Sequence, residues 1–219
     1  MMEELAALAQ WHNVRFLAQG LLITLRISLL TVIFSFILGT LLGVMRFSGH
    51  WLLSRVAAVY IESFRASPLI LLILLFRFTL PLKPINSGTL AMTLFTAAIV
   101  GEIVRGGLNS VDKGQWEAAF SQGFTWLETL RYIVLPQALR KMVPPLTGQF
   151  ITVVKDTSYV WVVGVQELTG KGVIILGQYG STVQFFAIFG MIGLIYWALC
   201  LAVYRLGRWQ EQRMSWLTM

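Results

Sequence analysis

The sequence contains few of the residues on which soluble enzymes depend. Only 12% of its 219 residues are charged, whereas soluble domains carry roughly 25%. The single cysteine, Cys200, lies in an apolar run and excludes an internal disulfide framework. The two histidines, His12 and His50, are isolated, so no metal-ligand cluster, Ser–His–Asp set or Cys–His set can be proposed. A Walker-type G-x-x-x-x-G-K-[ST] motif is also missing. We therefore expect no catalytic residues, no metal and no cofactor in this chain.

Apolar residues dominate what is present. They make up 57% of the chain, with a mean hydropathy of +0.73. A water-soluble core cannot absorb this much apolar surface, so the sequence predicts an integral membrane protein. Eight tryptophans and six tyrosines suit two interfacial belts. The formal charge of +7 does not indicate nucleic-acid binding, because the basic residues mostly sit beside the apolar runs.

The apolar runs predict an all-α protein with about five membrane spans. A span needs about 20 apolar residues, and the candidate segments are 27–45, 56–78, 85–101, 142–163 and 181–204. Residues 1–18 are expected to form an amphipathic surface helix. No internal repeat or second domain is visible, so residues 1–219 are treated as one transmembrane domain.

Basic residues flanking the spans predict the orientation. With the N-terminus outside, ten basic residues fall in inner segments: Arg46, Arg55, Arg105, Lys113, Arg131, Arg140, Lys141, Arg205, Arg208 and Arg213. Only three, Arg15, Lys83 and Lys171, fall in outer segments. The positive-inside rule therefore predicts an outside N-terminus, an inside C-terminus and a cytoplasmic loop at residues 105–141.

This loop is predicted to hold two short helices. Asp112 followed by Gln115 resembles a helix start, and Gly123 is a typical residue after a helix end. Thr125 and Glu128 form a capping-box pattern that opens the second helix, which Pro136 is expected to close. Residue spacing places Trp116, Ala119 and Phe120 on one face of the first helix. Physics alone leaves two interpretations open, a helix lying on lipid or a knob that docks on a partner.

Sequence motifs along nearly the whole chain resemble one family of membrane proteins. They are "YIESFRASPLI" (60–70), "EIVRGGLNSVDKGQWEAA" (102–119), "IVLP" (133–136), "LPQALRKMVPPL" (135–146) and "KDTS" (155–158). This set is similar to permease subunits of bacterial ABC importers with an EAA loop, in the branch that takes up histidine, arginine, glutamine and glutamate. The resemblance implies a type I ABC importer permease fold in the bacterial inner membrane.

The resemblance also implies a role for the loop and a set of partners. The first loop helix would be a coupling helix seated on a cytoplasmic ATPase, with Glu117, Ala118, Ala119 and Gly123 carried over and Gln115 on its first turn. Two ATPase subunits, holding ATP and Mg²⁺, would drive the pathway. A second permease subunit, identical or homologous, and an extracytoplasmic amino-acid-binding protein would complete the complex. Lipid and the amino acid are further partners, and nucleic acid is not.

Charged residues inside spans cost about 2.5 to 3.5 kcal/mol each, so they suggest function. Lys155, Asp156, Thr157 and Ser158 interrupt the fourth span, either as a self-paired structural bend or as groups that complement an amino acid's own charges. The resemblance favours the substrate site. We expect Asp156 and Thr157 to face the pathway and Lys155 to turn to a structural partner. Gln149, six residues before Lys155 on the same helix, adds a neutral amide.

The second span carries further charges. Glu62 and Arg65 are predicted to pair at i, i+3 spacing, and Pro68 to kink the helix. Arg77 either snorkels to headgroups or adds positive charge to an outer vestibule that would suit an acidic substrate. In the first span, Gly39 and Gly43 form a G-x-x-x-G pattern that permits close helix packing but identifies no partner by itself.

The favoured function is the transmembrane subunit of an ATP-driven importer of polar amino acids. The alternative is a secondary transporter or channel driven by an ion gradient, for which the usual inverted repeat is not visible. A membrane scaffold without transport is disfavoured by charges at Lys155 and Asp156.

Overall fold

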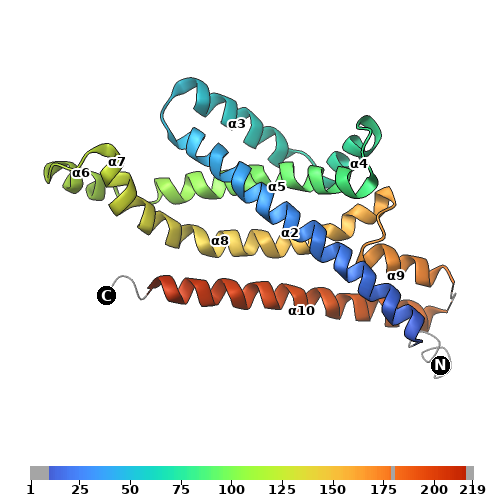
Figure 1. The fold of residues 1–219 in the computed structure, drawn as a ribbon. Coiled ribbons are helices and arrows are strands. Elements are labelled where there is room, and N and C mark those ends of the chain that lie inside the picture. The colour runs from blue at the N-terminus through green and yellow to red at the C-terminus, as the bar shows by residue number, and fades with distance from the viewer. Residues whose placement is uncertain (1–9, 179–180, 216–219) are drawn as a thin grey trace. The chain divides into compact units, whose positions relative to one another are not determined.

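The computed structural model describes residues 10–178 and 181–215. Within these ranges the regular structure is entirely helical (Figure 1). The α-helices in chain order are α2 (Trp11–Phe47), α3 (Trp51–Ala66), α4 (Leu69–Thr79), α5 (Pro84–Asn109), α6 (Lys113–Ser121), α7 (Trp126–Glu128), α8 (Leu135–Asp156), α9 (Leu168–Leu176) and α10 (Thr182–Ser215). A π-helix, η1 (Thr129–Val134), precedes α8, and a 3₁₀ helix, η2 (Thr157–Val163), follows it. The first nine residues of the predicted amphipathic segment 1–18 lie outside the described residues.

The helices include as many potential spans as the sequence predicts. Across the described residues, α2, α5 and α10 are long and apolar enough to cross a membrane without interruption. Two interrupted pairs, α3 with α4 and Trp126–Val163 with α9, raise the number to five if each pair is one span. This agrees with the five predicted spans and with the all-α fold class.

The second span is broken rather than kinked. Helix α3 ends at Ala66 and α4 begins at Leu69, with Pro68 as its N-cap residue at φ −65° and ψ 127°. Proline disfavours helical conformation at the residue before it, here Ser67. The prediction of a bend at Pro68 is therefore confirmed in place, but the helix stops and restarts there.

Helix α9 is an element that the sequence analysis did not predict. Lys171 was assigned to an outer segment, yet it is 4% exposed and lies in this helix. Its Nζ donates to Gln19 Oε1 at 2.8 Å and lies 3.9 Å from the ring centroid of Phe16. The amine is thus engaged by α2 instead of standing free in a loop.

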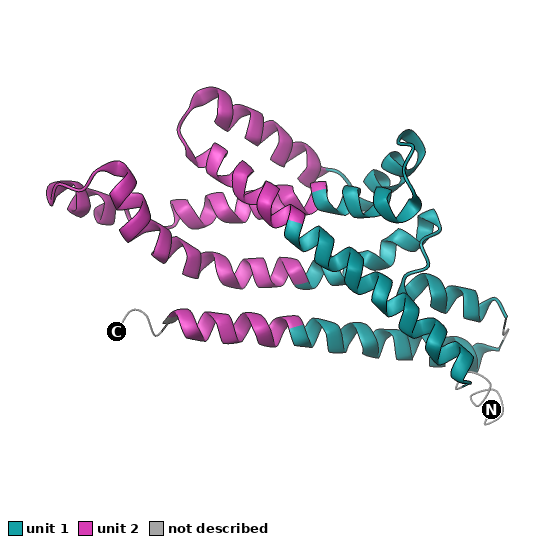
Figure 2. Cartoon of the chain, in the orientation of Figure 1, with its two compact units in different colours: residues 1–33, 67–93, 151–202 teal, residues 34–66, 94–150, 203–219 magenta. Residues whose placement is uncertain are grey.

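The chain divides into two compact units (Figure 2). Unit 1 comprises residues 1–33, 67–93 and 151–202, and unit 2 comprises residues 34–66, 94–150 and 203–219. Each has its own apolar core. In unit 1 the core cluster is Leu17, Leu168, Ile175, Ile188 and Ile192.

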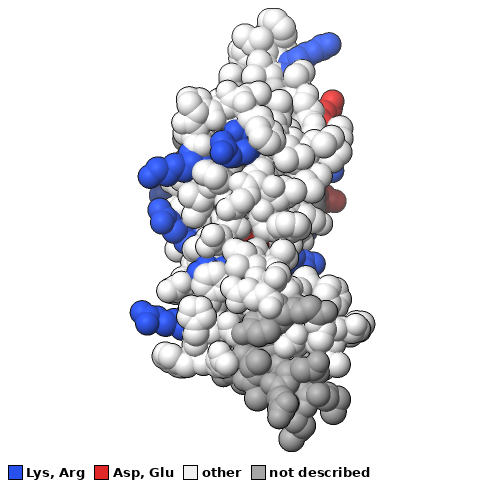
Figure 3. Space-filling view, turned by 90° about the vertical axis from the view of Figure 1, so that its right-hand side faces the viewer, with Lys and Arg blue, Asp and Glu red and all other residues white. Residues whose placement is uncertain are grey.

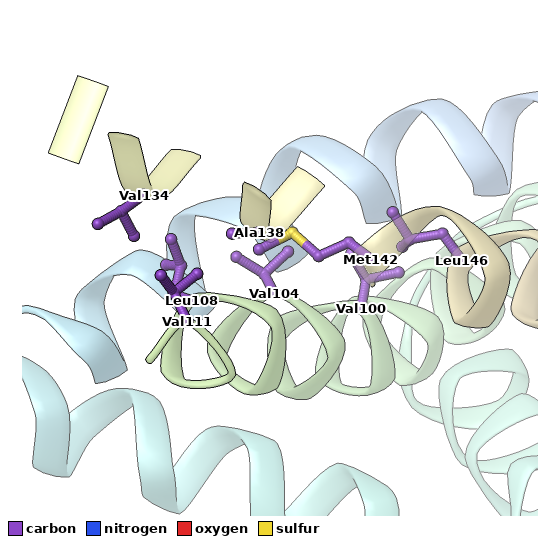
Figure 4. Packing of buried hydrophobic residues seen from close by; sticks show 8 residues of the cluster. All are labelled: Val100, Val104, Leu108, Val111, Val134, Ala138, Met142 and Leu146. Atoms are coloured by element: carbon purple, nitrogen blue, oxygen red, sulfur yellow. The ribbon is translucent and has the colours of Figure 1, made fainter. Parts of the chain in front are cut away.

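Unit 2 contains the larger apolar cluster, shown in Figure 4. Its buried residues are Val100, Val104, Leu108, Val111, Val134, Ala138, Met142 and Leu146. Most of them recur every fourth residue along α5 and along the η1–α8 segment, which is the row spacing that interlocks packed helices. The cluster holds the α6–η1 segment to the rest of unit 2, because Trp116 and Leu130 pack against it.

Helix α2 approaches α5 closely in unit 2 at the two glycines of the G-x-x-x-G pattern. A Cβ at Gly39 would lie 2.6 Å from the Val100 Cβ, and one at Gly43 would lie 2.6 Å from the Gly101 carbonyl oxygen. These distances are too short for any side chain. The partner of the motif is therefore α5 of the same chain.

Large apolar side chains are exposed along the described helices, among them Leu22, Phe34, Trp51, Leu194 and Trp197. Side chains other than Lys, Arg, Asp and Glu cover most of the face in Figure 3. The apolar window of α10 is only 11% buried, compared with 61% for α5. Apolar surface of this extent requires lipid or a partner to cover it.

Candidate functional site

Helix α6, the first helix of the predicted loop at residues 105–141, begins as predicted. Asp112 is its N-cap residue, and its side chain accepts a hydrogen bond from the Gly114 N–H at 2.6 Å. After the helix, Gly123 adopts φ +86°, a left-handed conformation that glycine adopts without strain. The chain therefore turns sharply at Gly123.

The second helix starts with the predicted capping box. Glu128 accepts from the Thr125 hydroxyl at 2.7 Å and from the Thr125 N–H at 2.8 Å. These two hydrogen bonds lower the pKa of the exposed Glu128 carboxyl. The prediction that Pro136 closes this helix is wrong, because the chain continues through the π-helix η1 into α8. Pro136 directly follows the π-helix, where the regular i→i−4 hydrogen bonds are already interrupted, and α8 continues past two further prolines, Pro144 and Pro145.

The predicted coupling residues do not all face solvent. Gln115, Glu117, Ala118 and Gly123 are exposed, whereas Ala119 is only 2% exposed. The methyl group of Ala119 therefore faces the protein's own interior and not an external partner. The other four residues are the ones accessible to a partner protein.

An aromatic cluster fixes α6 in unit 2. The Trp116 ring centroid lies 6.5 Å from that of Phe47, 6.0 Å from that of Phe120 and 6.1 Å from that of Trp126. Such aromatic contacts contribute about 0.5 to 1.5 kcal/mol each beyond area burial. Helix α6 is consequently packed against the rest of unit 2 through Trp116, which also contacts the apolar cluster of α5 and α8.

The Lys155–Ser158 segment, here called the KDTS motif, lies where α8 gives way to η2 in unit 1. Asp156 is the last residue of α8 and is half-buried, and Lys155 is exposed. Thr157 is 0% exposed, and its Oγ1 donates to the Val154 carbonyl at 2.7 Å. The Thr157 side chain therefore points into the unit, whereas we had expected it to face a pathway.

Other predicted site residues are spread over the chain. Arg77 is half-buried near the end of α4, a helix that contacts η2 within unit 1. Gln149 belongs to α8 but falls in unit 2. Its Nε2 is buried and has no hydrogen-bond partner among the described residues.

A buried carboxylate, Glu167, was missed by the sequence analysis. It is 0% exposed and is the N-cap residue of α9. Its carboxylate accepts from Thr169 N at 2.9 Å, Gly170 N at 2.8 Å, the Tyr196 hydroxyl at 2.9 Å and Thr24 Oγ1 at 3.4 Å. A helix N-terminus favours a carboxylate, because its first N–H groups lack intrahelical partners. The sequence feature that could have identified Glu167 is an acidic residue directly before an apolar run.

A charge cluster in unit 2 also differs from the prediction. Glu62 pairs with Arg46 at 2.9 Å, so the partner lies on α2 and not at the predicted Arg65. Arg46 also reaches Glu102 at 3.2 Å, and Arg105 Nε donates to Glu102 at 3.0 Å. The cluster connects the ends of α2, α3 and α5.

Comparison with known proteins agrees with this architecture. Residues 14–216 match the family described as "Binding-protein-dependent transport system inner membrane component". Over 203 residues the chain is 41% identical to the probable glutamine ABC transporter permease protein GlnP of Bacillus subtilis (strain 168), covering 90% of this chain and 93% of that protein. It is 34% identical over 215 residues to the glutamine transport system permease protein GlnP of Escherichia coli (strain K12), covering 94% and 96%.

Solved structures show the same fold. A crystal structure of an amino acid ABC transporter with histidines aligns with a TM-score of 0.83 and 31% identity, covering 92% of this chain and 95% of that chain. The MetNI methionine ABC transporter, in inward-facing conformations, aligns with a TM-score of 0.73 at 22% identity, which shows shared fold alone.

The chain therefore belongs to the family of inner membrane components of binding-protein-dependent transport systems. The resemblance to permease subunits of polar-amino-acid ABC importers is confirmed, as are the type I importer fold and the inner-membrane location. These matches favour the importer interpretation over the secondary transporter or channel.

Proposed function

We propose that this chain forms the membrane pathway of an ATP-driven importer whose substrate is a polar amino acid of the glutamine class. The observation that carries the proposal is similarity along nearly the full length to permeases named for glutamine, at 41% and 34% identity. The chain contributes the pathway, and ATP with Mg²⁺ is held by separate cytoplasmic ATPase subunits.

The KDTS motif is the proposed place of substrate contact. A zwitterion leaving water needs an acceptor for its ammonium and donors for its carboxylate, or its desolvation is uncompensated. Half-buried Asp156 is the proposed acceptor, and Ser158 and Lys155 are donors beside it. The buried Thr157 holds the motif in place. Arg77 is the proposed source of positive charge on α4.

Gln149 is a separate candidate. Because its buried Nε2 lacks a partner among the described residues, an incoming carbonyl or carboxylate would satisfy a group that is otherwise costly to bury. Its contribution is proposed independently of the motif in unit 1.

Coupling to ATP hydrolysis is proposed to use the exposed side of α6. Glu117, Ala118 and Gln115 would seat in a cleft on an ATPase subunit, and Gly123 would supply the turn behind the helix. Two ATPase subunits, a second permease subunit and an extracytoplasmic binding protein complete the proposed complex, with the N-terminus outside and the C-terminus inside.

Reconstitution tests the proposal. The chain is placed in proteoliposomes with its partner permease, ATPase subunits and binding protein, and glutamine uptake is measured with and without ATP and Mg²⁺ on the ATPase side. We expect uptake only with ATP. We also expect Asp156→Asn, which preserves shape but removes the charge, to lose most uptake or to change preference among acidic, neutral and basic amino acids.

A matched variant, Glu211→Gln, also removes one carboxylate charge, from an exposed pair with Arg208. Exposed pairs contribute about 0 to 1 kcal/mol, so uptake should stay at the wild-type level. Uptake driven by an ion gradient without ATP would refute the importer. Unchanged kinetics of Asp156→Asn across all amino acids would move the substrate site elsewhere.

A further inference from the structure

A series of polar contacts inside unit 1 connects the KDTS motif to the buried carboxyl group of Glu167. Tyr196, on α10, donates its hydroxyl proton to Glu167 Oε2 at 2.9 Å. The same hydroxyl oxygen lies 3.4 Å from Thr157 Oγ1 and 3.2 Å from Thr169 Oγ1. One phenol therefore touches the motif on one side and the cap of α9 on the other.

The number of protons sets the direction of these contacts. The Tyr196 hydroxyl has one proton and donates it in the hydrogen bond to Glu167, so toward Thr157 and Thr169 it can only accept. Thr157 likewise has one proton, and the Val154 carbonyl at 2.7 Å competes with Tyr196 for it. Glu167 thus fixes the orientation of the Tyr196 hydroxyl, and this hydroxyl stands as the alternative acceptor for Thr157.

Thr157 occupies a sensitive position in the backbone. It is the first residue of η2, directly after the last residue of α8. The final carbonyls of an α-helix have no intrahelical partner, and inside a membrane such groups must be satisfied within the protein. The Thr157 hydroxyl satisfies one of these carbonyls, that of Val154, directly beside Asp156.

The cap of α9 does not need Tyr196. The Thr169 and Gly170 N–H groups already bond to Glu167, which completes a helix cap. The additional bond to a residue on α10 extends the network toward the motif. The amine of Lys171, one turn further on, donates instead to Gln19 Oε1 at 2.8 Å.

We propose that Tyr196 and Glu167 are positioning residues that hold Thr157, and through it Asp156, in the geometry required for the amino acid substrate. This inference rests on the proposed function, in which the KDTS motif contacts the substrate. Neither residue is proposed to touch the amino acid. Their effect passes through the end of α8.

The test uses the assembled transporter in proteoliposomes and measures glutamine transported per ATP hydrolysed. Tyr196→Phe removes only the hydroxyl, so we expect this ratio to fall about threefold to tenfold, the size of one lost hydrogen bond. In the double variant with Asp156→Asn, the ratio should be no lower than for Asp156→Asn alone, because both changes act on one site. Tyr204→Phe, an exposed position on the same helix, is the matched control and should keep the wild-type ratio.

These variants distinguish a positioning role of Tyr196 from a purely structural one. A wild-type ratio for Tyr196→Phe, or a double variant with multiplied losses, would overturn positioning while leaving the substrate site intact. Unchanged kinetics for Asp156→Asn would instead remove the proposed site itself. If Tyr196→Phe does not assemble, Glu167→Gln, which keeps an oxygen acceptor for Tyr196, is measured in the same way. Failure of both to assemble would show a purely structural role.

Discussion

Substitutions at two neighbouring alanines of α6 can distinguish an effect on folding from an effect on docking of a partner. Ala118 is exposed and Ala119 is 2% exposed, so the same enlargement at each position meets different surroundings. Leucine is nearly as good a helix former as alanine, so Ala→Leu leaves the helix itself almost unaffected. At Ala119 the added atoms enter a packed interior, where overpacking costs about 1 to 3 kcal/mol. This corresponds to roughly a fivefold to 150-fold loss in the folded-to-unfolded ratio.

At Ala118 the added atoms enter solvent, so stability should change by less than about 0.5 kcal/mol. If the exposed side of α6 seats in an ATPase cleft, the same atoms overpack that joint instead. A penalty of about 1 to 3 kcal/mol there weakens the dissociation constant for the ATPase about fivefold to 150-fold. Ala119→Leu should therefore lower thermal stability, and Ala118→Leu should lower ATPase affinity at unchanged stability.

Both quantities can be measured on purified protein in nanodiscs. Thermal stability is followed as the monodisperse fraction after heating, and ATPase affinity by titration with a labelled ATPase subunit. Wild-type affinity and uptake in Ala118→Leu would refute docking through this face. Wild-type thermal stability in Ala119→Leu would refute its packing in the interior.

Two further predictions concern packing and orientation. Gly43→Ala should lower thermal stability, because its Cβ would stand 2.6 Å from a backbone carbonyl oxygen of α5, whereas Gly106→Ala, with nothing within 4 Å, should be neutral or slightly stabilising. Equal stability of the two variants would contradict the close approach of α2 and α5. In a Cys200→Ala background, a cysteine placed at Lys83 should be labelled by a membrane-impermeant thiol reagent from the periplasmic side only, and one at Gln210 from the cytoplasmic side only. Labelling of both from one side would disprove the predicted orientation.

Much of the local structure follows from the sequence because its causes are short-range. Apolar runs of span length predict the five spans, since lipid accepts only segments that satisfy their own backbone. Asp112 and the Thr125–Glu128 pair cap their helices as predicted. The failure at Pro136 has a tertiary cause as well as a local one. Proline removes one backbone hydrogen bond without necessarily ending a helix, and α8 runs on through Pro136, Pro144 and Pro145.

Side-chain partners required the tertiary structure. Glu62 and Arg65 have the spacing of a helical ion pair. Glu62 nevertheless pairs with Arg46, because α3 folds back beside the end of α2 in unit 2. The sequence placed Ala119 on one face of its helix with Trp116 and Phe120, but it did not show which face is buried. Only the packing of α6 shows that Ala119 points inward and that Ala118 is exposed.

The sequence by itself determined the membrane class and the family, and it located the helix starts at Asp112 and Thr125. It also predicted five spans, the number that the described residues give if each interrupted pair is one span. Each depends on composition, periodicity or an ordered set of motifs that can be seen along the chain. Only the tertiary structure revealed that Glu167 is buried among Thr24, Thr169, Gly170 and Tyr196, with Thr24 lying 143 positions away. A carboxylate can be buried only where several donors converge on it. That convergence arises from the packing of α2, α9 and α10, which no local pattern encodes.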